Sequence, residues 1–436
     1  MGLQLICLDN LGHAGSRAGR GPFTDLILGD IFPESMPASL SELVLGWETH
    51  FELDVFHDHP NHYQRTFRAW TLAYREQEAL ARALVGPEAC RSYARYFAAG
   101  EAVFRLREHS LYRVILTKRP RPKTWAVTVR PSDIPPPTDR VSGPPGASAD
   151  AVRAHYDVSD SFYELWLGPS MMYSSAMWAG TETRADLERA QQRKIDFFAR
   201  KVLPGPGPRR ALDVGCGWGW SLRRLAEAHR VSDATGLTLS RAQFDYLTRH
   251  PVPGADIRLE DWNDHDPGEP YNAIFSFGAF EHFARDGTTG PQRIAVYRRF
   301  FRSCMEWLAP GGRLALETIA HDGAPDTDAP LGRGPLGDFV LSLYPESLCP
   351  HLSEIVLGFE PFFEVEVLRS DPGDFARTCR AWLTALREDE QEAAVATDEQ
   401  VVLQFRRYLA ASEIQFRTRT VTNYRLILRR RPGVRI

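Results

Sequence analysis

The chain has 436 residues, of which 43% are hydrophobic and 25% are charged, and this composition is typical of a soluble globular protein with two or three domains. Its formal net charge of −4 lies close to neutral, which argues against a nucleic-acid partner. No apolar run approaches the ~18 residues of a membrane span.

The cysteines and the N-terminus indicate the compartment. The six cysteines are scattered and form no Cys-x-x-Cys motif, which is typical of a reducing cytosol and argues against a metal site. The first residues have neither the basic start nor the long apolar core of a signal peptide. We therefore expect a cytoplasmic protein that holds no metal.

The N-terminal part of the chain resembles the C-terminal part. Residues 21–118 match residues 334–430 at a nearly constant offset, and self-similarity of this length exceeds chance. Each copy predicts a strand, helical segments, a second strand, two longer helices and a final strand. The clearest matches are Leu40–Gly46 with Leu352–Gly358, Arg65–Trp70 with Arg377–Trp382, Arg95–Glu101 with Arg407–Glu413, and Tyr112–Leu116 with Tyr424–Leu428.

The N-terminal copy predicts a separate small α/β domain. Its first strand contains Leu3–Ile6, which resembles Leu314–Glu317. Its three strands could form their own small sheet, and one edge of that sheet would then need cover. Tyr63 in this copy matches Phe375 in the other, so Tyr63 could reach a shared active site. The alternative is that the whole region is a structural cap.

A linker separates the N-terminal copy from the main domain. Prolines cluster through residues 119–148, and proline excludes both helix interiors and central strands. We therefore divide the chain into a repeat domain at 1–118, a linker at 119–148 and a main domain at 149–436.

Strands and helices alternate in the main domain. This alternation predicts a parallel, doubly wound, Rossmann-like α/β sheet. Ligands of such sheets bind at the carboxyl ends of the strands. The predicted strands are Ala211–Val214, Ala234–Leu239, Ile257–Leu259, Tyr271–Gly278 and Arg313–Ile319.

The first of these strands runs into a glycine-rich turn and then a helix. Gly215, Gly217 and Gly219 allow the backbone to turn sharply and to approach a ligand, which could be NAD, FAD or S-adenosylmethionine (SAM). Asp213 precedes the glycines and suits the ammonium of a methionine group. The next strand, ending at Ser240, lacks the acid that usually binds a dinucleotide ribose. These details favour SAM over a dinucleotide.

Several motifs in residues 151–436 resemble one enzyme family, the cyclopropane-fatty-acid synthases and mycolic acid methyltransferases. The resemblance implies a class I SAM-dependent methyltransferase fold, with a helical substrate lid and the last strands in 321–436. The N-terminal domain would then repeat the C-terminal third of this fold. The motifs are His155-Tyr-Asp157, Tyr173-Ser-Ser-Ala176, Leu212–Gly219, Gly236–Gln243 and Gly278–Phe283.

The resemblance also implies a reaction. The family transfers a methyl group from SAM to an alkene carbon, and a base then removes a proton from the resulting carbocation. Loss of the proton from the new methyl group closes a cyclopropane, whereas loss from a neighbouring carbon gives a methylated alkene. We expect an apolar, alkene-containing lipid, acyl or natural-product substrate. The sequence does not decide between a cyclopropane and a methylated alkene as the product.

Residues for the cofactor follow from the family motifs. The resemblance implies contacts with three parts of SAM, namely the methionine end, the ribose and the adenine. The implied residues are Tyr173, Ser174, Asp213, Gly215 and Gly217 at the methionine end, Thr238, Leu239 and Gln243 at the ribose, and Trp262 and Asn263 at the adenine.

The implied base site departs from the family pattern. The family holds a bicarbonate base with a Cys, a Glu, a His and a Tyr. Glu281 matches the Glu, but Ser175, Glu317 and Phe375 occupy the other three positions. A bicarbonate would meet two carboxylates here, so we hypothesise that Glu317 takes its place as base. Two neighbouring carboxylates should also raise the pKa of one of them.

Three alternatives stay open. Glu317 could simply pair with a nearby arginine. The enzyme could still depend on bicarbonate, as a cyclopropane fatty acid synthase. The changed base site and the duplicated region would also suit a non-catalytic protein that binds a lipid or a partner.

Basic residues gather near the end of each copy. They could contact a phosphate head group, an acyl carrier or an anionic membrane, and the alternative is a solvated face. The sequence leaves the oligomeric state open. The residues are Arg105, Arg107, Arg113, Lys118 and Arg119 in the N-terminal copy, and Arg417, Arg419, Arg425, Arg429, Arg430 and Arg431 in the C-terminal copy.

Overall fold

The computed structural model describes residues 1–8, 31–32, 37–107, 109–120, 159–203, 205, 209–285, 287–322, 339, 343 and 346–432. Most of the predicted linker and the motif at His155 lie outside the described residues. Within the described part, no helix is both long enough and apolar enough to cross a membrane.

One ten-stranded sheet joins the two parts of the chain, in the order β1-β3-β2-β9-β10-β8-β7-β4-β5-β6. Strands β4 to β8 pair in parallel, whereas β10 is antiparallel to both β8 and β9. The strands are β1 (Gly2–Leu8), β2 (Phe51–Asp58), β3 (His109–Lys118), β4 (Arg209–Val214), β5 (Val231–Thr238), β6 (Ala255–Leu259), β7 (Tyr271–Phe277), β8 (Leu308–His321), β9 (Phe363–Ser370) and β10 (Val421–Arg430).

Helices connect the parallel strands, so the predicted doubly wound sheet is confirmed. Strand β7 carries Ala273, Ile274 and Phe275 in succession, and all three are fully buried. Continuous burial of this kind is typical of a parallel strand that is covered on both faces. The connecting helices are α8 (Trp220–His229), α9 (Arg241–Arg249) and α10 (Gly290–Trp307), and α7 (Leu187–Val202) precedes β4.

The lid consists of α6 (Asp160–Leu167), α13 (Pro372–Glu388), α14 (Glu390–Ala396) and α15 (Glu399–Arg417). Helix α13 begins with a proline in its first turn, where the missing amide hydrogen costs nothing. Aromatic side chains hold the lid together. The ring of Trp166 on α6 lies 5.8 Å from that of Trp382 on α13 and 5.9 Å from that of Phe405 on α15.

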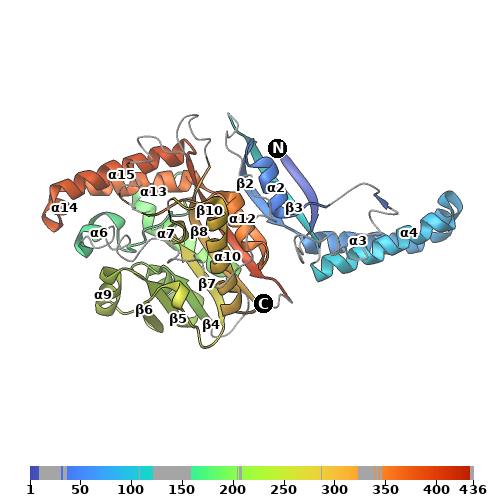
Figure 1. Ribbon diagram of the computed structural model, residues 1–436, viewed down its shortest axis with the longest axis horizontal. Helices are drawn as coiled ribbons and strands as arrows, with labels where there is room; N and C mark the ends of the chain where they lie inside the picture. The colour runs from blue at the N-terminus through green and yellow to red at the C-terminus, as the bar shows by residue number, and fades with distance from the viewer. Residues whose placement is uncertain are drawn as a thin grey trace.

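The N-terminal region has the same order of elements as the end of the main domain. Strand β1, α2 (Leu40–Trp47), β2, α3 (Pro60–Glu76), α4 (Glu78–Leu106) and β3 follow the order of β8, α12 (Leu352–Phe359), β9, α13, α14 with α15, and β10. Helices α3 and α4 form a hairpin that projects away from the main domain (Figure 1). A common origin of the two regions stays a prediction.

Two details of the N-terminal region differ from expectation. It does not form its own sheet, because β2 pairs with β9 through Val55, Phe56 and His57. Both strands would otherwise expose an open edge, and pairing satisfies their backbone groups. The register of β1 also differs: the cross-strand partner of Leu3 is Val114, as that of Leu316 is Leu426. Leu3 therefore corresponds to Leu316 and not to Leu314 as predicted. The predicted and observed alignments differ by two residues, and a shift of two residues keeps the same side chains on the same face of the strand.

Candidate active site

The turn after β4 forms one wall of a cavity at the carboxyl ends of the strands. Gly215, Gly217 and Gly219 have φ angles of 82°, 56° and 79°, a region that favours glycine. A Cβ atom on Gly215 would lie 2.5 Å from the Cβ of Ala279. The sequence therefore needs glycine here both for the backbone conformation and for the close approach of the loop after β7.

Nine of the ten predicted cofactor residues line this one cavity. Asn263 does not line it; its backbone and side-chain nitrogens donate to Asp261 Oδ1 at 2.9 and 2.7 Å, and Asp261 lines the cavity in its place. Sequence reasoning did not place Glu260 or His282 at this cavity, and both line it. The nine are Tyr173, Ser174, Asp213, Gly215, Gly217, Thr238, Leu239, Gln243 and Trp262.

Asp213 presents an acceptor to the cavity. Its Oδ2 accepts a hydrogen bond from Ser221, whereas its buried Oδ1 has no hydrogen-bond partner among the described residues. Burial raises the pKa of the Asp213 carboxyl to about 7, although Ser221 and Lys194 oppose the rise. Buried acceptors are seldom left unpaired, so this atom suits a ligand that brings a positively charged donor.

Lys194 on α7 lies behind Ser174. Its Nζ donates to Ser174 Oγ at 2.5 Å and lies 3.3 Å from Glu317 Oε1. Burial lowers the pKa of the Lys194 amine to about 8, although the neighbouring Glu317 opposes this. Because an ammonium group can only donate, Ser174 Oγ must accept, and its own hydroxyl hydrogen is left to donate elsewhere.

The cavity is also lined by aromatic side chains and an amide. The ring of Trp262 lies 5.3 Å from that of Phe283, and both residues are buried. Thr238 Oγ1 donates to Gln243 Oε1 at 2.7 Å and thereby fixes the orientation of the amide. A flat wall beside an oriented amide is suited to a heterocycle with an attached sugar.

Glu281 does not line this cavity and lies beside β8. It belongs to the short 3-10 helix η6 (Phe280–His282), and its Oε2 accepts from Thr318 Oγ1 at 2.9 Å. Burial raises the pKa of the Glu281 carboxyl to about 7, and the charge of Glu317 adds to the rise. The pKa of one carboxyl is thus raised, as expected, but the main cause is burial and not the neighbouring carboxylate.

Glu317 is surrounded by donors. Its Oε2 accepts from Arg425 Nε at 2.8 Å and from Asn423 Nδ2 at 3.3 Å, and Lys194 lies beside its other oxygen. All of these groups are buried. The structure therefore agrees with the alternative interpretation of the sequence, in which Glu317 pairs with an arginine.

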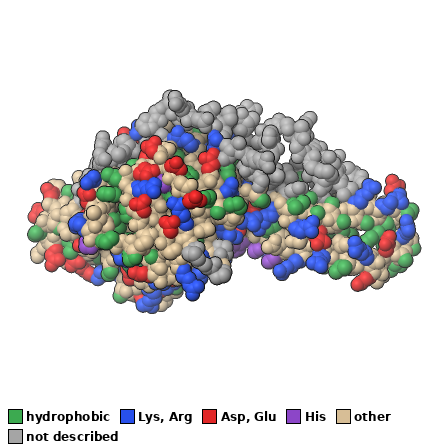
Figure 2. Space-filling model, turned by 90° about the horizontal axis from the view of Figure 1, so that it is seen from below, with side chains coloured by type: hydrophobic (Ala, Val, Ile, Leu, Met, Phe, Trp, Pro, Cys, Tyr) green, Lys and Arg blue, Asp and Glu red, His purple; other side chains and the backbone are tan. Residues whose placement is uncertain are grey.

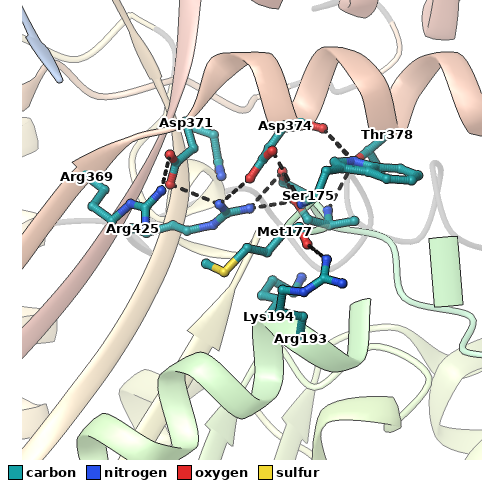
Figure 3. Close-up of polar contacts among 12 residues, drawn as sticks. Ser175, Met177, Arg193, Lys194, Arg369, Asp371, Asp374, Thr378 and Arg425 are labelled. Atoms are coloured by element: carbon teal, nitrogen blue, oxygen red, sulfur yellow. Dashed lines mark hydrogen bonds and ion pairs between the residues drawn. The ribbon is translucent and has the colours of Figure 1, made fainter. Parts of the chain in front are cut away.

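Arg425 on β10 is the centre of this cluster (Figure 3). Its Nη1 donates to Asp371 Oδ2 at 2.9 Å and to Asp374 Oδ2 at 2.8 Å, and its Nη2 donates to Ser175 Oγ at 3.1 Å. Arg425 was grouped with arginines that could form a solvated face, but it is fully buried. Ser175 therefore belongs to the Arg425 cluster, and neither Ser175 nor Glu317 lines the cofactor cavity.

Tyr63 does not reach this site, so that hypothesis is wrong. Its ring packs within the α3–α4 hairpin, 5.0 Å from Phe67 and 4.9 Å from Phe104. In the main domain, Phe375 stacks on Phe416 with ring centroids 4.2 Å apart. Nonpolar packing thus replaces the tyrosine hydroxyl that the family pattern has at this position.

The sheet order, the glycine turn and the cavity at the strand ends define a class I SAM-dependent methyltransferase. The family model described as mycolic acid cyclopropane synthetase matches residues 6–114 and 146–426. The chain therefore belongs to this family, and the predicted fold class, family and enzyme class are confirmed.

Individual relatives agree with this membership. Cyclopropane mycolic acid synthase 2 of Mycobacterium leprae is 33% identical over 287 residues, which cover 62% of this chain and 90% of the relative. A probable fatty acid methyltransferase of Pseudomonas putida is 32% identical over 293 residues, which cover 64% of this chain and 69% of the relative.

Solved structures show the same fold. The cyclopropane synthase MmaA2 of Mycobacterium tuberculosis matches with a TM-score of 0.57 and 28% identity, over 65% of this chain and 99% of that one. The mycolic acid cyclopropane synthase CmaA1, which was solved with SAH and CTAB, matches with the same TM-score, identity and coverage.

Proposed function

We propose that this protein is a SAM-dependent C-methyltransferase that acts on a carbon–carbon double bond of an apolar lipid. The observation that carries the proposal is the buried Oδ1 of Asp213 beside the glycine turn, which has no hydrogen-bond partner in the described part of the chain. A ligand with an ammonium group would complete this site. The names of the relatives, which are cyclopropane mycolic acid synthases and a fatty acid methyltransferase, support a lipid substrate.

In this proposal the residues that line the cavity would hold SAM, and SAM would supply the electrophilic methyl group. Asp213 accepts from the ammonium, while Ser174 donates its hydroxyl hydrogen to the carboxylate, with the Lys194 charge behind it. Gln243 offers its amide to the ribose, and Trp262 provides a face for the adenine. Holding the cofactor at both ends fixes the approach of the methyl group to the alkene.

We place the base role on Glu281 in preference to Glu317. The oxygens of Glu317 already accept from Arg425 and Asn423 and lie beside Lys194, so both oxygens are occupied by these partners. Glu281 has a pKa of about 7, so near neutral pH it can be ionised and can accept a proton. Its carboxylate takes the proton from the carbocation, and the released C–H electrons form either the cyclopropane bond or a new double bond.

We further propose that the reaction needs no bicarbonate. The positions expected to hold that anion carry Ser175, Glu317 and Phe375. Ser175 and Glu317 are joined to Arg425, and Phe375 packs on Phe416. The donors of Arg425 that could hold an anion are already used by Glu317, Asp371 and Asp374, and these carboxylates would repel a further anion.

Calorimetric titration with S-adenosylhomocysteine (SAH), which has the same amino-acid end as SAM, tests the cofactor site. We expect the wild type to bind, and Asp213→Asn to bind roughly 10- to 100-fold more weakly because a charge-assisted hydrogen bond is lost. Asp245→Asn, on the exposed side of α9, is the matched control and should bind normally. Absence of binding by folded wild-type protein would contradict the proposal.

A further inference from the structure

The N-terminal region is related to the end of the main domain by an approximate twofold axis. The axis passes between β2 and β9, where Phe56 pairs with Leu368. These residues are 312 apart (368 minus 56), and the same offset separates Leu40 from Leu352 in the sequence repeat. The flanking pairs, Val55 with Arg369 and His57 with Val367, are arranged symmetrically about this point.

Contacts across this axis occur in matched pairs. Arg107 lies 3.0 Å from Glu364, and Arg419 lies 2.8 Å from Glu52. A second matched pair lies at the first residues of α2 and α12. The backbone nitrogen of Leu40 donates to Glu360 Oε1, and the backbone nitrogen of Leu352 donates to Glu48 Oε1. The two regions thus face each other as two subunits of a dimer would, and the α3–α4 hairpin is the counterpart of lid helices α13 to α15.

The hairpin exposes side chains whose counterparts in the lid are covered. Trp382 and Phe405 are 1% and 4% exposed, and both contact Trp166 on α6. Their counterparts Trp70 and Tyr93 are 41% and 45% exposed. Within the described part of the N-terminal region, no helix covers this position as α6 covers the lid.

Further large apolar side chains are exposed toward the tip of the hairpin. The chain turns there at Gly86, which has a φ of 83°, and Pro87 follows it. The corresponding lid helices, residues 372–419, expose only Val395 and Ile414 among their described large apolar side chains. At the hairpin the exposed residues are Leu72 (53%), Leu80 (56%), Leu84 (74%) and Val85 (60%).

The hairpin is also basic, unlike its counterpart. Residues 60–107 contain eight arginines and four glutamates, which gives a formal charge of +4. Residues 372–419 contain seven arginines and eight acidic residues, which gives −1. Figure 2 shows basic and hydrophobic side chains side by side along the hairpin.

We propose that the α3–α4 hairpin docks onto the anionic surface of a lipid bilayer. Exposed apolar side chains on a projecting element are suited to a fluid apolar phase that can surround them, whereas a protein partner would need a matching groove. The arginines would attract anionic head groups. Trp70 and Tyr93 are of the types that favour the interface between head groups and acyl chains.

Vesicle sedimentation of the full-length protein tests this proposal. We expect binding to phosphatidylglycerol vesicles that weakens at high salt, and much weaker binding to phosphatidylcholine vesicles. Leu80→Ser with Leu84→Ser, and separately Arg65→Glu with Arg68→Glu, should each weaken binding by at least about tenfold. Val395→Ser, which alters an 89% exposed side chain on α14, is the matched control and should bind like the wild type.

Three outcomes would overturn the proposal. One is no binding to either type of vesicle, and another is binding that neither hairpin variant weakens. The third is a dimeric wild type that becomes monomeric in the leucine variant, because the hairpin would then cover a second copy. Circular dichroism checks that each variant is folded. If the Leu80→Ser, Leu84→Ser double variant does not fold, the single variant Leu84→Ser replaces it.

Discussion

Arg425 is the residue on which the buried ion-pair cluster depends most. It is fully buried and donates to Glu317, Asp371 and Asp374, and it also contacts Ser175. Several charges that are buried together are stable only while each has its partners. Ser175 and Glu317, two of the three changed family positions, are therefore parts of one ion-pair cluster, whereas Phe375 packs on Phe416.

Replacing Arg425 by alanine should strongly destabilise the protein. The change leaves three carboxylates without their shared cation, and we expect a loss of about 3–5 kcal/mol in the free energy of unfolding. Urea unfolding measures this. Arg241→Ala, which removes an exposed pair with Asp245, is the control and should change little. A similar small effect in both variants would contradict the account of the cluster.

Lys194 should act on the amino-acid end of the cofactor alone. We expect Lys194→Met to weaken SAH binding by about tenfold or more, while binding of methylthioadenosine, which lacks the amino-acid end, stays unchanged. Because the Lys194 pKa is about 8, SAH affinity should fall as the pH rises above 8. Lys194→Arg should keep its affinity to higher pH because arginine stays charged.

Titration calorimetry over a pH series separates these cases. Equal losses for SAH and methylthioadenosine in Lys194→Met would mean that Lys194 only supports the fold of the cavity. A wild-type affinity that stays constant to pH 9 would contradict the electrostatic role.

At the scale of elements, the glycine turn is the feature that the sequence predicted best. The strand, the turn and the helix are adjacent in the chain, so local rules suffice to identify them. The same holds for the five parallel strands. Their carboxyl ends also bring nine of the ten residues predicted for the cofactor to one cavity, and that these residues bind the cofactor stays a prediction. Asn263 does not line the cavity, because its nitrogens donate to the neighbouring Asp261, which lines the cavity instead.

Gly215→Ala tests the geometry of the turn. The new methyl group would meet Ala279 at 2.5 Å, and the φ of 82° would be strained as well. We expect SAH binding to be lost or greatly weakened. Gly46→Ala at the end of α2 has free space and should bind normally. If Ala279→Gly partly restores SAH binding to Gly215→Ala, the restored part is due to the steric contact between the two residues. Unchanged SAH binding in Gly215→Ala would contradict the need for glycine at this position.

The contacts of the base site could not be predicted in the same way. Lys194 lies on α7, Glu317 on β8 and Arg425 on β10, so they meet only through the order of strands in the sheet. Arg425 stands among other arginines in the sequence, and the alternation of a strand does not say which side is buried. Only the pairing of β10 with β8, which sets Arg425 opposite Glu317, identifies it as internal.

At the scale of the whole molecule, the N-terminal region and the main domain share one sheet. The prediction of a separate small sheet was wrong because β2 and β9 each have an edge that the other can pair. The N-terminal region therefore extends the sheet that contains Glu317 on β8 and Arg425 on β10. It leaves its own hairpin exposed at the far end of the molecule (Figure 1).

The central claim is that this methyltransferase uses Glu281 as its base without bicarbonate. The most direct test is the rate of methyl transfer from SAM to an unsaturated lipid, with and without bicarbonate, and with proton NMR to identify the product. We predict a rate that bicarbonate does not change and that rises with pH through about 7, because Glu281 must be ionised. Glu281→Gln should lower the rate by about 10²- to 10⁴-fold while SAH still binds. A clear requirement for bicarbonate, or full activity in Glu281→Gln, would contradict the account.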